Sequence, residues 1–125
     1  MNDTSAPVPL SILTEEESAF REAVAAFAEG EVRPRVADME AAARLDPELI
    51  PKYFEMGLMG IQVPEELGGA GGSLMMTTIA VEELSKVDAA AAIMVDVQNT
   101  LVLYPMLRYT TAAQKARFLP RLCSE

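Results

Sequence analysis

The sequence predicts an all-α fold, a bundle of about six helices, and three observations carry the prediction. Thr14 with Glu17, and Thr111 with Gln114, have the spacing of capping boxes, in which each side chain satisfies a free backbone donor at a helix start. Between these points, apolar residues recur at three- and four-residue spacing, which is the period of a helix. Half of the 125 residues are apolar, which suffices for the core of one domain.

The first helix should begin directly after Thr14. One stripe of this segment is apolar and should face the core, and it consists of Phe20, Ala23, Val24 and Phe27. Pro34 has no backbone N–H to donate, so we expect it to break or restart the chain. A second short helix should then run through Met39 to Ala43.

The third and fourth helices are predicted from the residues that begin them. Asp46 followed by Pro47 has the pattern of an N-cap and a first-turn proline, and the helix that they start should end at Gly57. Ser73 can cap a fourth helix that reaches Val87. Both helices are bounded by residues that favour turns, so each should be a separate element.

The fifth helix should be capped by Asp88 and run to about Tyr109, and Thr111 should cap a sixth. Because AAAAIMV offers apolar atoms on every side, we expect the fifth helix to be the most buried element. Buried polar groups need partners, and this helix carries Asp96, Gln98, Asn99 and Thr100. Either Asp96 and Asn99 bridge helices, or one face of this helix lines a ligand slot.

The glycine-rich segment LGGAGGS, which precedes the fourth helix, has two interpretations. One is a phosphate cradle, since Gly69 and Gly71 match the first two positions of a dinucleotide fingerprint. Leu74 stands where the third glycine is needed, and Pro64 breaks the strand that should come first. The second interpretation, a tight backbone turn between helices, is therefore the one that we favour.

The side chains available for chemistry are few. The chain has no His, which excludes a His-based triad, a His-ligated metal and an imidazole base. Cys123 is the single cysteine, so we interpret it as an ordinary thiol in a reducing compartment. Glu83 should pair with a nearby cation and its neighbour Glu82 should face water, because adjacent helical residues do not face each other. We predict no metal site and no catalytic residue in this segment.

The formal net charge of −9 argues against nucleic acid as a partner, because phosphate recognition needs clustered Lys and Arg. The charge is uneven: residues 105–125 hold four cations against Glu125, a net charge of +3, and residues 1–104 have a net charge of −12. This basic end is either a solvated helix face or a contact for an acidic domain, another subunit or a phosphate-bearing ligand.

Residues 1–12 are predicted to form a flexible leading arm, because they lack the positive start and apolar core of a secretory signal. The longest weakly charged stretch, residues 89–107, contains Asp96 and Pro105 among other residues that are costly in lipid. We therefore expect no membrane span, no secretion, and a location in the cytoplasm or in the reducing interior of an organelle.

Four segments of the chain follow one another in a distinctive order: LTEEESAFREAVAAFAEGEVRP, GLMGIQVPEELGGAGG, VEELSK and AAQKARFLPRL. In this order they resemble the amino-terminal helical domain of the flavin-dependent acyl-CoA dehydrogenases, from about Leu13 to Leu122. The sequence QNTL, residues 98–101, is most similar to the short/branched-chain members. The resemblance implies one helical domain over residues 13–125, with the flavin-binding middle and carboxy-terminal domains of the family absent from this chain.

Enzymes of this family desaturate the α,β-bond of an acyl-CoA thioester with FAD, which electron-transferring flavoprotein then reoxidises. By resemblance, the flavin and the glutamate base lie beyond Glu125, so we expect no FAD bound to this segment alone. The resemblance assigns to this segment one wall of the acyl pocket, with substrate-binding residues Ile93, Met94, Val97, Gln98 and Leu101. Their bulk predicts a short slot and thus a short or branched acyl group.

Two functions of different classes follow from these observations. The first is a domain of an acyl-CoA dehydrogenase, which should not turn over alone. Its expected partners are the remaining dehydrogenase domains, the acyl-CoA substrate, electron-transferring flavoprotein and further copies in a homo-oligomer. The alternative is a free-standing, non-catalytic helical interaction module, or a split subunit, on the same fold.

Overall fold

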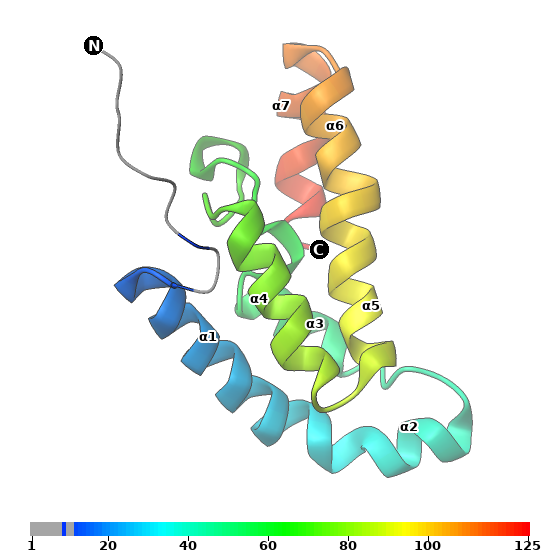
Figure 1. The fold of residues 1–125 in the computed structure, drawn as a ribbon. Helices are drawn as coiled ribbons and strands as arrows, with labels where there is room; N and C mark the ends of the chain where they lie inside the picture. Colours follow the sequence, from blue (N-terminus) through cyan, green and yellow to red (C-terminus); the bar gives the residue numbers. More distant parts are fainter. Residues whose placement is uncertain (1–8, 10–11) are drawn as a thin grey trace.

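A computed structural model describes residue 9 and residues 12–125 (Figure 1). Within this part the chain forms helices and turns and no strand, so the predicted all-α fold is confirmed. Most of the predicted leading arm, residues 1–12, lies outside the described residues. The α-helices are α1 (Glu15–Phe27), α2 (Val36–Ala42), α3 (Leu49–Glu55), α4 (Leu74–Ser85), α5 (Ala89–Val97), α6 (Tyr104–Tyr109) and α7 (Ala112–Leu122). The shorter segments are π-helical η1 (Ala28–Val32) and η5 (Gln98–Leu103), and 3-10 helical η2 (Arg33–Arg35), η3 (Leu58–Gly60) and η4 (Glu65–Leu67).

The first two helices form one bent helical path (Figure 1). The predicted capping box begins it: Thr14 Oγ1 accepts the Glu17 N–H at 3.1 Å, and the Glu17 carboxylate accepts the Thr14 N–H at 2.9 Å. Pro34 lies in η2, and the wider η1 turn before it carries the helix onward without an interruption. Of the two predicted outcomes at Pro34, a break or a restart, the structure shows the restart, with a bend. Ala43, in the left-handed conformation at φ 51°, ends α2.

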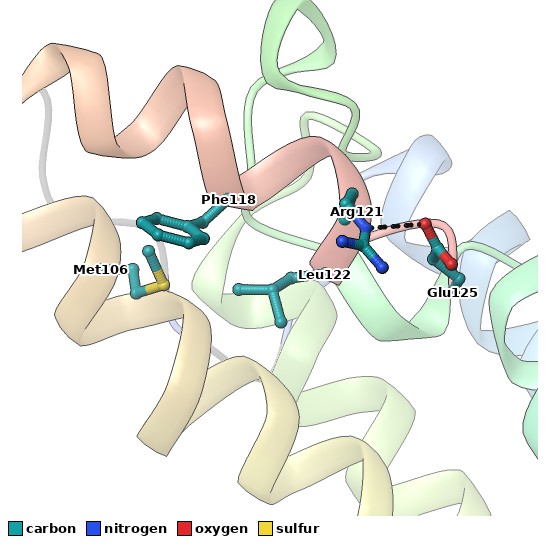
Figure 2. Close-up of a pocket in the computed structure, with 5 residues that line it drawn as sticks. All are labelled: Met106, Phe118, Arg121, Leu122 and Glu125. Atoms are coloured by element: carbon teal, nitrogen blue, oxygen red, sulfur yellow. Dashed lines mark hydrogen bonds and ion pairs between the residues drawn. The ribbon is translucent and has the colours of Figure 1, made fainter.

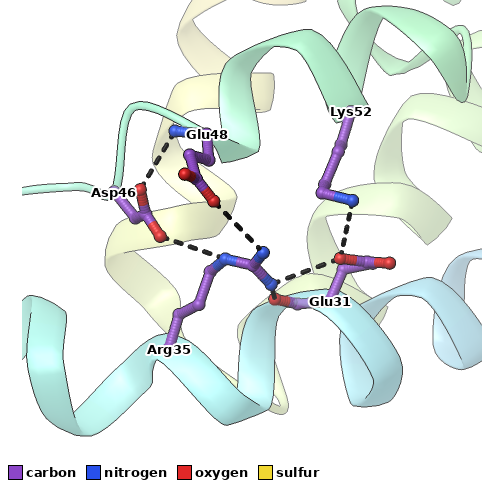
Figure 3. A network of polar contacts seen from close by, with 5 residues as sticks. All are labelled: Glu31, Arg35, Asp46, Glu48 and Lys52. Carbon is purple, nitrogen blue, oxygen red and sulfur yellow. Dashed lines mark hydrogen bonds and ion pairs between the residues drawn. The ribbon is translucent and has the colours of Figure 1, made fainter.

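An ion-pair network around Arg35 holds the connection between α2 and α3 (Figure 3). The Arg35 guanidinium contacts Asp46 at 3.0 Å and Glu31 at 3.2 Å, and Lys52 of α3 contacts Glu31 at 3.0 Å. The hydrogen bond from Lys52 is the main reason that the pKa of Glu31 is lowered. Asp46, the predicted N-cap of α3, does not occupy that position. Its Oδ1 accepts the N–H of Glu48 in a turn, and α3 begins at Leu49 with Glu48 as the N-cap residue.

The glycine-rich loop is a turn held by its own backbone. Every N–H from Gly68 to Gly72 donates to a carbonyl of residues 60–65, over 2.6 to 3.2 Å. Gly68 has a φ of +93°, and a Cβ on Gly69 would lie 2.0 Å from the Val63 carbonyl oxygen. The predicted tight turn is confirmed, and the N–H groups of residues 68–72 are not free to bind a phosphate.

A buried carboxylate joins α1 to α4. Glu83 is 6% exposed, and its Oε1 lies 2.6 Å from Lys86 Nζ and 3.5 Å from Arg21 Nε of α1. Glu82, one residue earlier, is half exposed, and its Oε1 lies farther from Lys86 Nζ, at 3.8 Å. The predicted pairing of Glu83 is confirmed, and Ser73 caps α4 as expected.

The segments α5, η5 and α6 form one continuous rod over Ala89–Tyr109, yellow to orange in Figure 1. Asp88 caps it through the Ala91 N–H at 3.0 Å, and α4 runs alongside. Its buried residues are Ala91, Ala92, Val95, Asn99 and Leu103. The expectation that this is the most buried element is wrong, because neighbouring elements cover only one side of the rod. If α1 with α2 and α5 with α6 are each counted as one continuous helix, the described residues form five helices, where about six were predicted.

Candidate functional site

An apolar stripe runs along the uncovered side of the rod. Its members are Ile93, Val97 and Leu101, which are 58%, 39% and 69% exposed. In a regular α-helix each step of four residues rotates by about 40°, so Leu101 would stand about 80° from Ile93. Leu101 lies in η5, whose wider turn reduces this rotation and keeps the three side chains on one face. We call Ile93, Val97 and Leu101 the outer stripe.

The opposite side of the rod is fixed by Asn99, which is 1% exposed. Its Nδ2 donates to the carbonyls of Leu58 at 2.7 Å and Val95 at 2.8 Å, and its Oδ1 accepts the Ile61 N–H at 3.0 Å. Both amide N–H groups are thus donated, and the amide oxygen accepts one hydrogen bond. Asn99 locks the rod to η3 and to Ile61 directly after it, which sets the rotation at which the outer stripe is presented.

Two further hydrogen bonds tie the rod to the rest of the bundle. Gln98 Nε2 donates to the Leu122 carbonyl of α7 at 2.7 Å and to the Met59 carbonyl at 3.3 Å. The buried Tyr53 hydroxyl of α3 donates to the Ala91 carbonyl at 3.2 Å. Burial, with a smaller effect of the Asp88 charge, raises the pKa of Tyr53 to about 12, so the phenol stays protonated.

The five predicted substrate-binding residues therefore divide into two groups. Ile93, Val97 and Leu101 lie together on the uncovered face, whereas Met94 packs against the core and Gln98 bonds to the backbone of other elements. Tyr104, 48% exposed, is a further apolar group next to the stripe that the sequence reasoning missed. The π-helical turn places it there, and the proline after it is the one sequence signal that could have pointed to an irregular turn.

Of the two interpretations of the polar cluster, helix bridging is right for Asn99 and wrong for Asp96, and the ligand slot stays a prediction. Asn99 bridges the rod to η3, as predicted. Asp96 does not bridge helices in the described part of the chain: its carboxylate accepts a hydrogen bond at 3.3 Å from Thr100, one turn along the same rod. The exposed face beside this cluster is apolar, so it can line a slot for an apolar group but has no group placed to move a proton.

No metal site is formed in residues 9 and 12–125, where no three His, Cys, Asp or Glu side chains gather. Cys123 is half-buried, and burial raises the pKa of its thiol, which disfavours the reactive thiolate. The glycine-rich loop does not fit a dinucleotide phosphate, because the N–H groups of residues 68–72 are bonded to carbonyls of residues 60–65. The side chains of the outer stripe are aliphatic and carry no ionisable group.

By length and composition alone the rod could span a membrane, since its 21 residues include a window with a mean hydropathy of 1.3. Asp96 lies near the middle of that length, and an ionisable group at the bilayer centre is costly. Gln98 and Asn99 bond to η3 and α7, so the inner side belongs to the bundle. We interpret the outer stripe as a surface for a protein or ligand.

A family profile described as "Acyl-CoA dehydrogenase, N-terminal domain" matches residues 14–125. This chain belongs to the acyl-CoA dehydrogenase family. A short/branched chain specific acyl-CoA dehydrogenase of Bos taurus is 39% identical over 117 residues, which are 94% of this chain and 27% of that protein. A probable enzyme of the same kind from Dictyostelium discoideum is 42% identical over 93% of this chain and 28% of its own length.

Solved structures agree with this assignment. The butyryl-CoA dehydrogenase of Megasphaera elsdenii superposes with a TM-score of 0.83 at 32% identity, over 90% of this chain and 30% of that one. The predicted resemblance to the family and to its short/branched-chain members is thus confirmed. The chain spans less than a third of the length of these acyl-CoA dehydrogenases.

Proposed function

We propose that this chain is the amino-terminal domain of an FAD-dependent enzyme that desaturates the α,β-bond of a short or branched acyl-CoA. The observation that carries the proposal is the outer stripe, an apolar face that the bundle leaves uncovered although it lies on a rod locked in place by Asn99. In the proposed enzyme the stripe forms one wall of the acyl slot. The family match and the identity to short/branched-chain enzymes favour this function over a free-standing interaction module.

The outer stripe would act by volume and by exclusion of water. Ile93, Val97 and Leu101 are large and branched, so they leave room for a short chain only. A methylene that fits or fails to fit an apolar slot changes binding by about 1–3 kcal/mol. The same side chains keep water from the acyl carbons, which strengthens polar interactions nearby.

The remaining parts of the reaction are assigned to other domains of the enzyme. FAD would accept the hydride when bound there, and the glycine-rich loop here does not fit its phosphates, because the N–H groups of residues 68–72 are bonded to carbonyls of residues 60–65. By family resemblance, electron-transferring flavoprotein reoxidises the flavin and the enzyme is a homo-oligomer. We further propose a location in the cytoplasm or in a reducing organelle interior.

The test is a chimeric enzyme in which residues 14–125 replace the matching segment of the butyryl-CoA dehydrogenase. Dye reduction is measured with straight and branched acyl-CoA thioesters of increasing length. We expect Val97→Ala and Leu101→Ala to shift the ratio of kcat/KM values towards longer chains by about tenfold. Leu74→Ala, at an equally exposed apolar residue on α4, is the matched control and should leave the ratio unchanged. An active chimera whose preference ignores both stripe substitutions would refute the proposal.

A second measurement addresses the alternative of a free-standing module. The intact mass of the natural protein is compared with the mass of these 125 residues, and the reading frame after Glu125 is sequenced. A larger mass and a continuous frame support the dehydrogenase domain. A mass equal to that of the 125 residues supports a module or a split subunit.

A further inference from the structure

One polar side chain joins helix α7 to the preceding part of the chain. Gln98, at the start of η5 in the rod, donates from Nε2 to the Leu122 carbonyl at 2.7 Å and to the Met59 carbonyl at 3.3 Å. In the described part of the chain, no other hydrogen bond or salt bridge links residues 111–125 to an earlier residue. The polar attachment of α7 therefore depends on Gln98.

The Leu122 carbonyl needs a partner from outside its own helix. It lies in the last turn of α7, and the last carbonyls of a helix have no N–H of the same helix to accept. The N–H groups of residues 123–125 donate to the carbonyls of Leu119 and Arg121 instead. Gln98 thus acts as a side-chain cap for the C-terminal end of a helix to which it does not belong.

The apolar packing between α7 and the rod is incomplete. Phe118 and Leu122 of α7 face Met106 of α6 across an open groove of about 620 Å³ (Figure 2). Phe118 is 44% exposed, and Leu119 is the one fully buried residue of α7. Well-packed protein interiors contain few voids larger than a water molecule. Apolar contact at the groove therefore constrains α7 weakly, whereas the bond from Gln98 opposes a shift of its last turn.

The last turn of α7 also lies on the segment that holds the rod. A Cβ on Gly60 of η3 would lie 2.8 Å from Cys123 Sγ, so the two elements approach closely there. Asn99 fastens the rod to the same segment through its side-chain amide. The rod and the end of α7 thus share one support, and Gln98 joins them to each other directly.

We propose that Gln98 is a positioning residue that fixes the last turn of α7 relative to the outer stripe. This inference rests on the proposed function, because in that enzyme the flavin-bearing domains follow the amino-terminal domain, and the end of α7 connects the acyl wall to them. Val97 of the outer stripe directly precedes Gln98, so one turn of the rod carries both the wall and its link to α7. A misplacement of about 1 Å can cost about 100-fold in rate, so this link would hold the acyl group at the correct distance for reaction.

Three substitutions separate the hydrogen-bond donor from the size of the side chain. Gln98→Met keeps the length and removes the donor, and Gln98→Glu places a carboxylate against two carbonyl oxygens. Gln98→Lys keeps a donor, and its charge suits the C-terminal end of a helix. Gln62→Met is the matched control, because the Gln62 amide is also half-buried but donates to Thr77 Oγ1 of α4, at 3.1 Å.

The first measurement is amide hydrogen exchange of the 125-residue chain. We expect Gln98→Met and Gln98→Glu to speed exchange in residues 116–125 by about tenfold or more relative to α1 and α4, because local opening of α7 becomes easier. Gln98→Lys should restore slow exchange, and Gln62→Met should leave residues 116–125 unchanged. Unchanged exchange there in the Met and Glu variants, or equal acceleration along the whole chain, would overturn the proposal.

The second measurement uses the chimeric enzyme described above. Gln98→Met should lower kcat by about tenfold or more and change KM by less than about threefold, because the outer stripe still binds the acyl group. Gln98→Lys should rescue kcat. The ratio of kcat/KM values between long and short chains should stay constant, whereas Val97→Ala shifts it.

The outcomes separate this inference from the proposed function. In an active chimera, an unchanged kcat, a rise in KM alone or a changed chain-length ratio for Gln98→Met would contradict a positioning role. An inactive chimera would count against the proposed function only, because the exchange measurement tests the link between Gln98 and α7 without turnover.

Discussion

Replacing Asn99 by Ala should destabilise the bundle more than any other single polar change in the rod. The substitution leaves the buried Ile61 N–H without an acceptor and the Leu58 carbonyl without its donor. Each unsatisfied buried group costs about 1–3 kcal/mol. The sum, about 2–6 kcal/mol, is a large fraction of the 5–15 kcal/mol that typically stabilises a domain. The Val95 carbonyl adds little, because it can still accept a bond from the backbone of the rod.

The assay is urea unfolding followed by far-UV circular dichroism, which suits a helical chain that has no Trp. Gln98→Ala is the matched control, because its amide also bonds to two carbonyls but is only half-buried. It should cost about 1 kcal/mol. Asn99→Asp should be at least as harmful as Asn99→Ala, since a carboxylate would face two carbonyl oxygens. A loss below about 1 kcal/mol for Asn99→Ala would refute the view that this amide locks the rod.

Three further predictions concern the loop, the buried phenol and the thiol. Gly69→Ala should lower the free energy of unfolding in urea by about 3 kcal/mol, because the added Cβ would collide with the Val63 carbonyl. Gly30→Ala is the control, since Gly30 has open space around it, and it should be neutral or stabilising by up to about 1 kcal/mol. The pKa of Tyr53 is raised from 10.0 to about 12, so the stability that its neutral phenol contributes is complete below pH 10 and is lost as the pH rises to 12. Unfolding at stepped pH should show a loss of about 2–3 kcal/mol in the free energy of unfolding, which Tyr53→Phe lacks. Cys123 should react with a thiol reagent more slowly in the folded chain than in urea at the same pH, because burial raises its pKa; equal rates would contradict this.

Local signals in the sequence were sufficient for most of the fold. Capping residues at Thr14, Ser73, Asp88 and Thr111 each mark a helix start in the structure, because these caps depend only on neighbours three residues away. The glycine-rich loop was also predictable, since the missing third glycine excluded a dinucleotide turn. These features need no knowledge of tertiary contacts.

What the sequence could not show depends on contacts between distant residues. Asp46 serves the Arg35 network and a local turn instead of capping α3, and its cation partner Arg35 comes from η2, eleven residues earlier in the chain. The apolar composition of α5 predicted burial on every side, but burial depends on what covers the helix, and here only one side is covered. Of the five predicted site residues, three share the outer stripe, because sequence spacing alone does not reveal the η5 turn that redirects Gln98.

The η5 turn determines how the rod would respond to the deletion of a residue in this region. A π-helical turn spans one residue more than an α-helical turn, so η5 can be regarded as a helix that has absorbed an extra residue. Deleting one residue between Val102 and Pro105 would therefore convert η5 into a regular helical turn and leave α6 in its present orientation, whereas the same deletion in a regular helix would rotate all later residues by about 100°. Met106 would then keep its orientation relative to Ile93 and Val97. The wider turn thus lets the rod carry one extra residue without a change in the phase of α6.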